Sequence, residues 1–358
     1  MKFAHMNAAL YYSYTEKAPK KIMRVIYDIT YRCNLRCNFC YYWNQDRERP
    51  NIDMMKHRSE LSTEEIKNRL IPQLKKAKVT HVTITGGEPF IKKDIIEILE
   101  AFSKDFHLTL LSNLSIESNE KLDAILKYVD SVKASIDLEK VFVSTRGVEG
   151  SFDKTVNSIK YLVSKGIKSL SLNAVLTPDN CTEISKVVDM AHDMGVKRVT
   201  FQFLDWQTPA TIKGTPFLQK PEIFGTLVNE VTIDADKALE QINLAQEKAE
   251  KYGMEFATFP VLLPLTKEII EQWYTNADYQ YTTKCLVPWF QLRINPYGGV
   301  MPCMEYDVGN IRDLDLLDIW NGPKYKGFRK VIRKGLLPRC NKCCKLDKSY
   351  SNLIKIKS

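Results

Sequence analysis

The sequence lacks the features that would place the chain in a membrane or on a secretion route. No apolar run reaches the roughly 18 residues that a membrane-spanning helix needs. The first ten residues do not show the charged-then-apolar order of a signal peptide. Histidine is scarce, at 5 residues in 358, and these form no cluster. We therefore expect a globular, cytoplasmic protein with no membrane partner.

The charge balance is basic, but it does not indicate a nucleic-acid partner. The chain has 52 Lys and Arg against 43 Asp and Glu, a formal charge of +9. These basic residues are scattered rather than gathered in one stretch, as nucleic-acid binding would require. We expect no nucleic acid, while a basic pocket for an anionic substrate stays open.

Cysteine is the exception in this ordinary composition. A disulfide framework is typical of small secreted domains, so the 9 cysteines of this long chain are better explained as ligands. Cys33, Cys37 and Cys40 have the spacing C-x3-C-x2-C. Three thiolates can hold three irons of a cubane cluster and leave the fourth iron open. The alternatives are structural thiols or a zinc site, but zinc favours a fourth nearby Cys or His, and none follows closely.

This cysteine run resembles the signature of the radical S-adenosylmethionine (radical SAM) enzymes, with Phe39 in its aromatic position. The resemblance implies that SAM binds the open iron of a [4Fe-4S] cluster. Reductive cleavage of SAM would then give a 5′-deoxyadenosyl radical that abstracts hydrogen from a substrate. It also implies an electron donor of the flavodoxin or ferredoxin type.

Alternating strand and helix patterns predict the fold class. We expect β-strands at Arg24–Thr30, His81–Thr85, Leu108–Ser112, Val132–Ile136, Ser169–Leu176 and Arg198–Leu204, with amphipathic helices between them. Six βα units in a row favour a parallel sheet with right-handed crossovers. The prediction is an α/β protein with a partial (β/α)6 TIM-type barrel, in which the chemistry lies at the carboxyl ends of the strands.

Motifs follow several of these strands, and the radical SAM resemblance suggests their roles. Gly86, Gly87, Glu88 and Pro89 match the stretch that holds the amino group of SAM, and their glycines allow close backbone approach to a ligand. Ser112 and Asn113 stand where relatives contact the ribose, although Leu114 replaces the usual glycine after them.

Further candidates follow the later strands. Ser135 is a candidate for the ribose or carboxylate of SAM, and Arg146 for its carboxylate, because a guanidinium forms paired hydrogen bonds with a carboxylate. Asn173 and Leu176 either contact the adenine or belong to the core. Asp205, at the end of the sixth strand, is a candidate catalytic base or substrate contact, or only a loop cap.

A second cysteine set lies near the carboxyl terminus. Cys285, Cys303, Cys340 and Cys343 form a closed set of four, which suits a second [4Fe-4S] cluster. The set resembles the SPASM extension in its shortened, twitch-type form and implies a small cysteine-rich α+β auxiliary-cluster domain. Zinc with the same ligands is the alternative. Cys344 is either a spare thiol or a substitute for Cys343.

The predicted organisation has four parts. Residues 1–22 form an amino-terminal extension, 23–205 the barrel core, 206–276 a helical bridge, and 277–358 the auxiliary domain with its tail.

Only about 22 residues precede the first strand, which leaves no room for a separate peptide-recognition domain. We therefore expect an oxidoreductase-type radical SAM enzyme that oxidises or rearranges a small polar molecule, such as a sugar or cyclitol. The alternatives are a maturase of a ribosomal peptide and a non-catalytic electron carrier.

Overall fold

The computed structural model describes residues 2–40, 58–215, 226–228, 230–303 and 306–347. A single ten-stranded sheet organises them, in the order β12-β11-β10-β1-β2-β3-β4-β5-β6-β9. Its strands are β1 (Arg24–Asp28), β2 (His81–Thr85), β3 (His107–Ser112), β4 (Ser131–Ser135), β5 (Leu170–Leu176), β6 (Arg198–Phe203), β9 (Glu255–Phe259), β10 (Gln291–Ile294), β11 (Gly299–Met301) and β12 (Gly309–Asn310). All pairs from β10 to β9 are parallel, and β11 and β12 add antiparallel pairs. A short pair, β7 (Trp206–Gln207) and β8 (Thr226–Leu227), stands apart.

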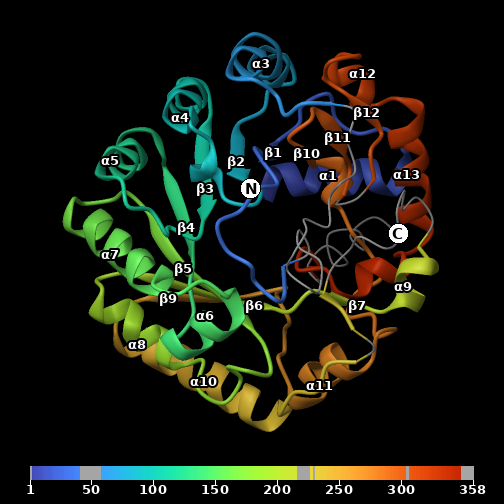
Figure 1. Ribbon diagram of the computed structural model, residues 1–358. Coiled ribbons are helices and arrows are strands. Elements are labelled where there is room, and N and C mark those ends of the chain that lie inside the picture. The colour runs from blue at the N-terminus through green and yellow to red at the C-terminus, as the bar shows by residue number, and fades with distance from the viewer. Residues whose placement is uncertain (1, 41–57, 216–225, 229, 304–305, 348–358) are drawn as a thin grey trace.

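Helices cover the outer face of the curved sheet (Figure 1). They are α2 (Thr63–Glu65), α3 (Ile71–Lys76), α4 (Ile95–Ser103), α5 (Asn119–Tyr128), α7 (Ser151–Ser164), α8 (Lys186–Asp193), α10 (Ala235–Lys251) and α11 (Lys267–Thr275), with a π-type turn at Ile66–Leu70 between α2 and α3. Two further helices, α6 (Glu139–Arg146) and α9 (Pro209–Lys213), lie outside this layer. The sequence Ser62-Thr-Glu-Glu65 predicts capping at the start of α2, and the cap is present. Ser62 Oγ accepts from Glu65 N, and the Glu65 carboxylate accepts from Ser62 N.

The core lies between the strands and this helical layer. Alternate strand residues that face the helices, such as Val82, Leu110, Val132 and Leu172, are completely buried. The other residues of β2 and β4 are only half-buried, because they face the inside of the curve. The predicted partial TIM-type α/β barrel is confirmed.

The structure departs from the sequence-based organisation at both edges of the barrel. Strand β9 extends the sheet beyond β6, so the interval predicted as a helical bridge is not only helical. Its helix α10 begins at Ala235, after the cap residue Asp234. Strand β10, from the predicted auxiliary domain, pairs with β1 of the core. The boundaries between the four parts stay predictions.

The carboxyl-terminal unit spans the open side of the barrel. Its hairpin extends the β1 edge, and Asp347 forms a parallel bridge with Val261, which follows β9 at the other edge. This unit also contains α12 (Leu316–Trp320), α13 (Pro323–Lys334) and a 3-10 turn at Pro338–Lys342. Helix α1 (Lys2–Tyr14) packs on it through an edge contact between the rings of Tyr12 and Trp289, 4.9 Å apart.

Candidate functional site

The first cysteine loop lies at the carboxyl end of β1 and is held by the end of α6. Arg36 N donates to Arg146 O at 2.9 Å, and Asn38 N donates to Thr145 O at 2.8 Å. Cys33, Cys37 and Cys40 are half-buried and form no disulfide. The loop therefore has backbone support from helix residues that lie 107 and 110 positions further along the chain.

The Gly86–Pro89 turn after β2 packs directly on this loop. Gly87 N donates to Thr30 O at 2.8 Å, and Glu88 N donates to Arg32 O at 2.9 Å. A Cβ on Gly86 would lie 2.2 Å from Thr30 O, and one on Gly87 would lie 2.1 Å from Arg32 O. The close backbone approach that these glycines allow is therefore to the cysteine loop, a partner that the sequence did not reveal.

Replacing Gly87 by alanine should force these two segments apart. We expect 5′-deoxyadenosine formation to fall by at least about 100-fold, because a displacement of about 1 Å at a reacting site costs that much. Gly327→Ala is the matched control, since no atom lies within 4 Å of the added Cβ. Chromatographic assay of 5′-deoxyadenosine measures the effect, and wild-type activity in Gly87→Ala would contradict this packing role.

Glu88 is buried and already bonded on both carboxylate oxygens. It accepts from Ser112 Oγ at 2.8 Å, Asn113 N at 2.8 Å and Phe90 N at 3.1 Å. These hydrogen bonds favour the ionised form, but burial outweighs them and raises the pKa of Glu88 to about 7. The carboxylate joins the ends of β2 and β3, and Pro89 begins a 3-10 turn, Pro89–Ile91, directly after it.

The turn after β3 has a backbone conformation that glycine adopts easily, although leucine stands at this position. Leu114 adopts a φ of 53°, in the left-handed region that glycine favours. Its side chain is completely buried, so apolar burial offsets the backbone strain. Asn113 Nδ2 donates to Asn34 Oδ1 at 2.8 Å, which brings this turn to the cysteine loop.

Three further candidates occupy β4 and β5. Ser135 and Asn173 are register partners on neighbouring strands, so they lie side by side on the inner face. Leu176 is completely buried, and its carbonyl accepts from Tyr274 at 2.6 Å. These contacts favour a packing role for Leu176.

Arg146 faces the first cysteine loop. Its Nη1 lies 3.7 Å from Cys37 Sγ, and its guanidinium carbon lies 5.5 Å from the ring centroid of Phe39. The side chain is buried at 4% exposure, yet Nε has no hydrogen-bond partner. A buried guanidinium donor without a partner fits an anionic group such as the carboxylate of SAM.

The second cysteine set is brought together from three segments. Cys285 precedes a 3-10 turn at Val287–Trp289, Cys303 follows β11, and Cys340 and Cys343 lie in and after the turn Pro338–Lys342. The Cys285 thiol interacts electrostatically with those of Cys303 and Cys340, and Cys343 with Cys303. All four thiols therefore share one region.

Comparison with known proteins identifies both cysteine regions. Residues 27–191 match the radical SAM superfamily, and residues 285–344 match the SPASM iron-sulfur cluster-binding domain. The chain is a radical SAM protein with a SPASM domain. The SPASM match begins at Cys285 and ends at Cys344, so it includes the whole second set.

Relatives extend over most of this radical SAM–SPASM chain. The subtilosin biosynthesis protein AlbA of Bacillus subtilis is 25% identical over 91% of the chain, which spans 64% of AlbA. The PqqA peptide cyclase of a Methylobacterium species is 24% identical over 90% of the chain and 79% of the relative. A probable GTP 3′,8-cyclase of Methanopyrus kandleri is 29% identical over 49% of the chain and 54% of the relative. The crystal structure of Streptococcus suis SuiB with its precursor peptide SuiA has the same fold, with a TM-score of 0.63 and 21% identity over 95% of this chain and 74% of SuiB.

The two domains use SAM and [4Fe-4S] clusters, and the donors present suit them. Burial raises the pKa of Cys33, Cys285 and Cys340 to about 12. A buried thiolate therefore needs compensating positive charge, which cluster irons supply on ligation. No helix of the described residues is long and apolar enough to cross a membrane.

Asp205 lies beside the SPASM cysteines rather than free at the barrel mouth. Its Oδ1 accepts from Arg339 Nη1 at 2.8 Å, and both side chains are largely buried. Arg339 directly precedes Cys340, whose thiol interacts electrostatically with Asp205. These contacts favour a role in joining β6 to the SPASM loop over that of a free base.

Lys342 is a site residue that sequence reasoning missed. It lies between Cys340 and Cys343 and is 2% exposed, with Nζ about 5.4 Å from the ring centroids of Trp206 and Trp273. Nζ donates to Asn276 O at 2.7 Å, beyond the carboxyl end of α11. The aromatic rings and the helix end together fix the SPASM C-x2-C loop.

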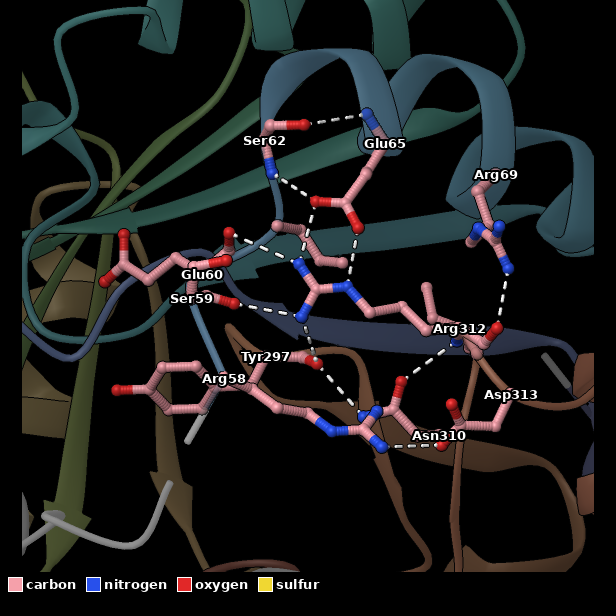
Figure 2. A network of polar contacts seen from close by, with 12 residues as sticks. Arg58, Ser59, Glu60, Ser62, Glu65, Arg69, Tyr297, Asn310, Arg312 and Asp313 are labelled. Atoms are coloured by element: carbon pink, nitrogen blue, oxygen red, sulfur yellow. Dashed lines mark hydrogen bonds and ion pairs between the residues drawn. The ribbon is translucent and has the colours of Figure 1, made fainter. Parts of the chain in front are cut away.

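Arg312 is a second missed residue, and it joins the SPASM domain to the radical SAM domain (Figure 2). Its guanidinium forms a paired contact with Glu65, at 2.5 and 2.7 Å, and donates to Ser59 O at 3.0 Å and Tyr297 O at 3.3 Å. Glu60, in the same segment, accepts from Thr30 at 2.6 Å, just before the first cysteine loop. A continuous set of contacts therefore runs from the SPASM domain to that loop.

Removing the Arg312 guanidinium should weaken the docking of the two domains. We expect Arg312→Met to lower the free energy of unfolding by about 2–3 kcal/mol, because charge-assisted hydrogen bonds are lost and Glu65 is left unpaired. Arg312 lowers the pKa of Glu65 to about 2, from 4.5. The stabilisation that ionised Glu65 gains from Arg312 is complete above about pH 4.5 and is lost as the pH falls toward 2. The loss of unfolding free energy in Arg312→Met should therefore be the same at about pH 6 and about pH 8. Urea unfolding at both pH values measures it, with Lys160→Gln, on an exposed helix face, as the control.

Proposed function

We propose that this chain is a maturase that modifies a precursor peptide by hydrogen abstraction. The observation that carries the proposal is the similarity to AlbA and the PqqA peptide cyclase over 90% or more of the chain, through both cysteine regions. The expectation of a small polar substrate is the less well supported reading. Matches to probable GTP 3′,8-cyclases, one over 49% of the chain and another over 82%, still favour it.

When bound, a SAM-ligated [4Fe-4S] cluster supplies the electron that cleaves SAM and so delivers the radical that takes hydrogen from the peptide. In this proposal Cys33, Cys37 and Cys40 hold that cluster. The Gly86–Pro89 turn borders the amino group of SAM, and Arg146 directs its unpartnered buried Nε to the carboxylate. The neighbouring Ser135 and Asn173 border the nucleoside on the inner face.

The SPASM cysteines would hold the second cluster, which would supply an electron acceptor for an oxidative modification. The electrostatic contact of Cys340 and Cys343 with Asp205 brings this set to the carboxyl end of β6, at the same mouth of the barrel. A flavodoxin- or ferredoxin-type protein would supply the first electron.

Anaerobic turnover tests the proposal. The reconstituted enzyme is incubated with SAM, a reductant and the short peptides encoded beside its gene, and the peptides are analysed by mass spectrometry. We expect one peptide to lose the mass of two hydrogen atoms, with formation of 5′-deoxyadenosine. If 5′-deoxyadenosine formation rises only with nucleotides or sugars and every peptide stays unchanged, the maturase proposal is wrong.

A further inference from the structure

Lys133 is a charged residue on the inner face of the barrel that none of the assignments above uses. It lies in the middle of β4, between Val132 and Ala134, which are completely buried toward the helices. Alternation along a strand turns Lys133 to the opposite, inner face, which it shares with Ser135. Lys133 is therefore on the same face as the proposed nucleoside contacts, two positions deeper.

The Lys133 side chain crosses the interior of the barrel. Its Nζ lies 5.6 Å from the ring centroid of Phe259, on β9, although β5 and β6 separate the two strands in the sheet. Lys133 also interacts electrostatically with Cys344 and Lys345, which directly follow the last SPASM ligand. Its amine thus lies between the proposed SAM contacts and the end of the second cysteine set.

Within the described part of the chain, Lys133 makes no hydrogen bond and no ion pair with a carboxylate. The charged groups that act on it most strongly are Lys345, Arg24 and Arg198, which are cationic, and the Cys344 thiol. Of these, Arg198 is paired with Glu255 at 2.7 Å. Burial first, and then the cations, lower the pKa of Lys133 to about 8. A half-buried amine with cationic neighbours favours an anion in contact with it.

We propose that Lys133 is a specificity-determining residue that binds a carboxylate of the substrate inside the barrel. The inference rests on the proposed function, in which the substrate lies between SAM and the second cluster. The substrate class is then a peptide that presents a carboxylate beside the modified residue. That carboxylate is either an Asp or Glu side chain or the peptide carboxyl terminus.

The first experiment does not depend on turnover. Reconstituted holoenzyme is treated with an isotope-coded acetylating reagent in increasing glutarate, and acetylation of each lysine is quantified by mass spectrometry. Glutarate should slow acetylation of Lys133 by about threefold at twice its dissociation constant, while neutral glutaramide has no effect. Lys160, an exposed helix residue, is the internal control and should react equally in both. Equal acetylation of Lys133 with glutarate and glutaramide would overturn the proposal.

The second experiment uses the modified peptide once it is known. Each Asp and Glu is changed to its amide, and the carboxyl terminus is amidated separately. One of these changes should weaken binding to the wild-type enzyme by about tenfold, the value of a charge-assisted hydrogen bond. The same change should have no effect on binding to Lys133→Gln. Lys133→Arg should still bind the carboxylate form of the peptide more tightly than the amide.

The two arms separate this inference from the proposed function. If glutarate protects Lys133 but no peptide is modified, the maturase proposal fails and anion binding at Lys133 stands. If a peptide is modified, but each amide substitution changes its binding to the wild-type enzyme and to Lys133→Gln by the same factor, the maturase proposal stands. Lys133 then has no role in specificity.

Discussion

Alanine at Cys33, Cys37 or Cys40 should reduce reductive SAM cleavage to background. Each thiolate is expected to hold one iron of the cluster whose fourth iron binds SAM, so loss of one ligand removes the open site. The structure adds a reason for single substitutions to suffice. The backbone of this loop is already fixed by Arg146 O and Thr145 O, so a neighbouring residue cannot move in as a replacement ligand. Assay of 5′-deoxyadenosine in anaerobic protein with dithionite and SAM measures the loss.

Cys181→Ala is the matched control for these three variants. Cys181 is 3% exposed, its thiol contacts Pro178 O at 3.4 Å, and it belongs to neither cysteine set. We expect this variant to keep wild-type SAM cleavage, with only a small loss of packing. Cleavage that persisted in Cys37→Ala would show that the open iron is held elsewhere.

Local patterns predicted those parts of the fold and site that depend on neighbouring residues. The alternation in His81–Thr85 and Arg198–Phe203 identified strands that the structure contains. The Ser62 and Glu65 pair identified a capping box that is present in full. Each of these features is set by contacts within a few positions, which a single sequence displays.

Features that depend on residues far apart in the chain could not be predicted from the sequence. Strand β9 is an exposed edge strand, and it joins the sheet only by pairing with β6, whose residues lie 57 positions earlier in the chain. Strand β10 pairs with β1, where Arg293 and Asp28 form a paired contact across 265 positions. Arg312 is an ordinary surface arginine in the sequence until Glu65 is placed beside it.

These distant contacts place the SPASM domain where its cysteines can act with the barrel. Arg293 joins it to β1, Arg312 joins it to Glu65 in α2, and Arg339 joins it to the loop after β6. The three arginines contact three separate parts of the barrel. We infer that the β1–β10 pairing and these ion pairs, rather than a linker, hold the SPASM domain across the open side of the barrel.

Replacing Cys340 and Cys343 together should separate SAM cleavage from product formation. All four predicted SPASM ligands are cysteines, so the second cluster would have no open iron and SAM would not bind there. Its expected tasks are to accept an electron from the substrate and to help fold its domain, because ligation free energy is partly folding free energy. The double variant should keep a measurable part of its SAM cleavage, while the modified peptide no longer forms.

Iron content distinguishes the outcomes of this experiment. Wild-type protein should hold about eight irons per chain, and the double variant about four. Circular dichroism must accompany the measurement, because the Lys342 contacts with Trp206 and Trp273 lie in the altered loop and help hold it to α11. Lys342→Met, which keeps both cysteines, shows how much of any loss comes from that packing alone. Full product formation by a folded double variant with about four irons would contradict the role of the second cluster.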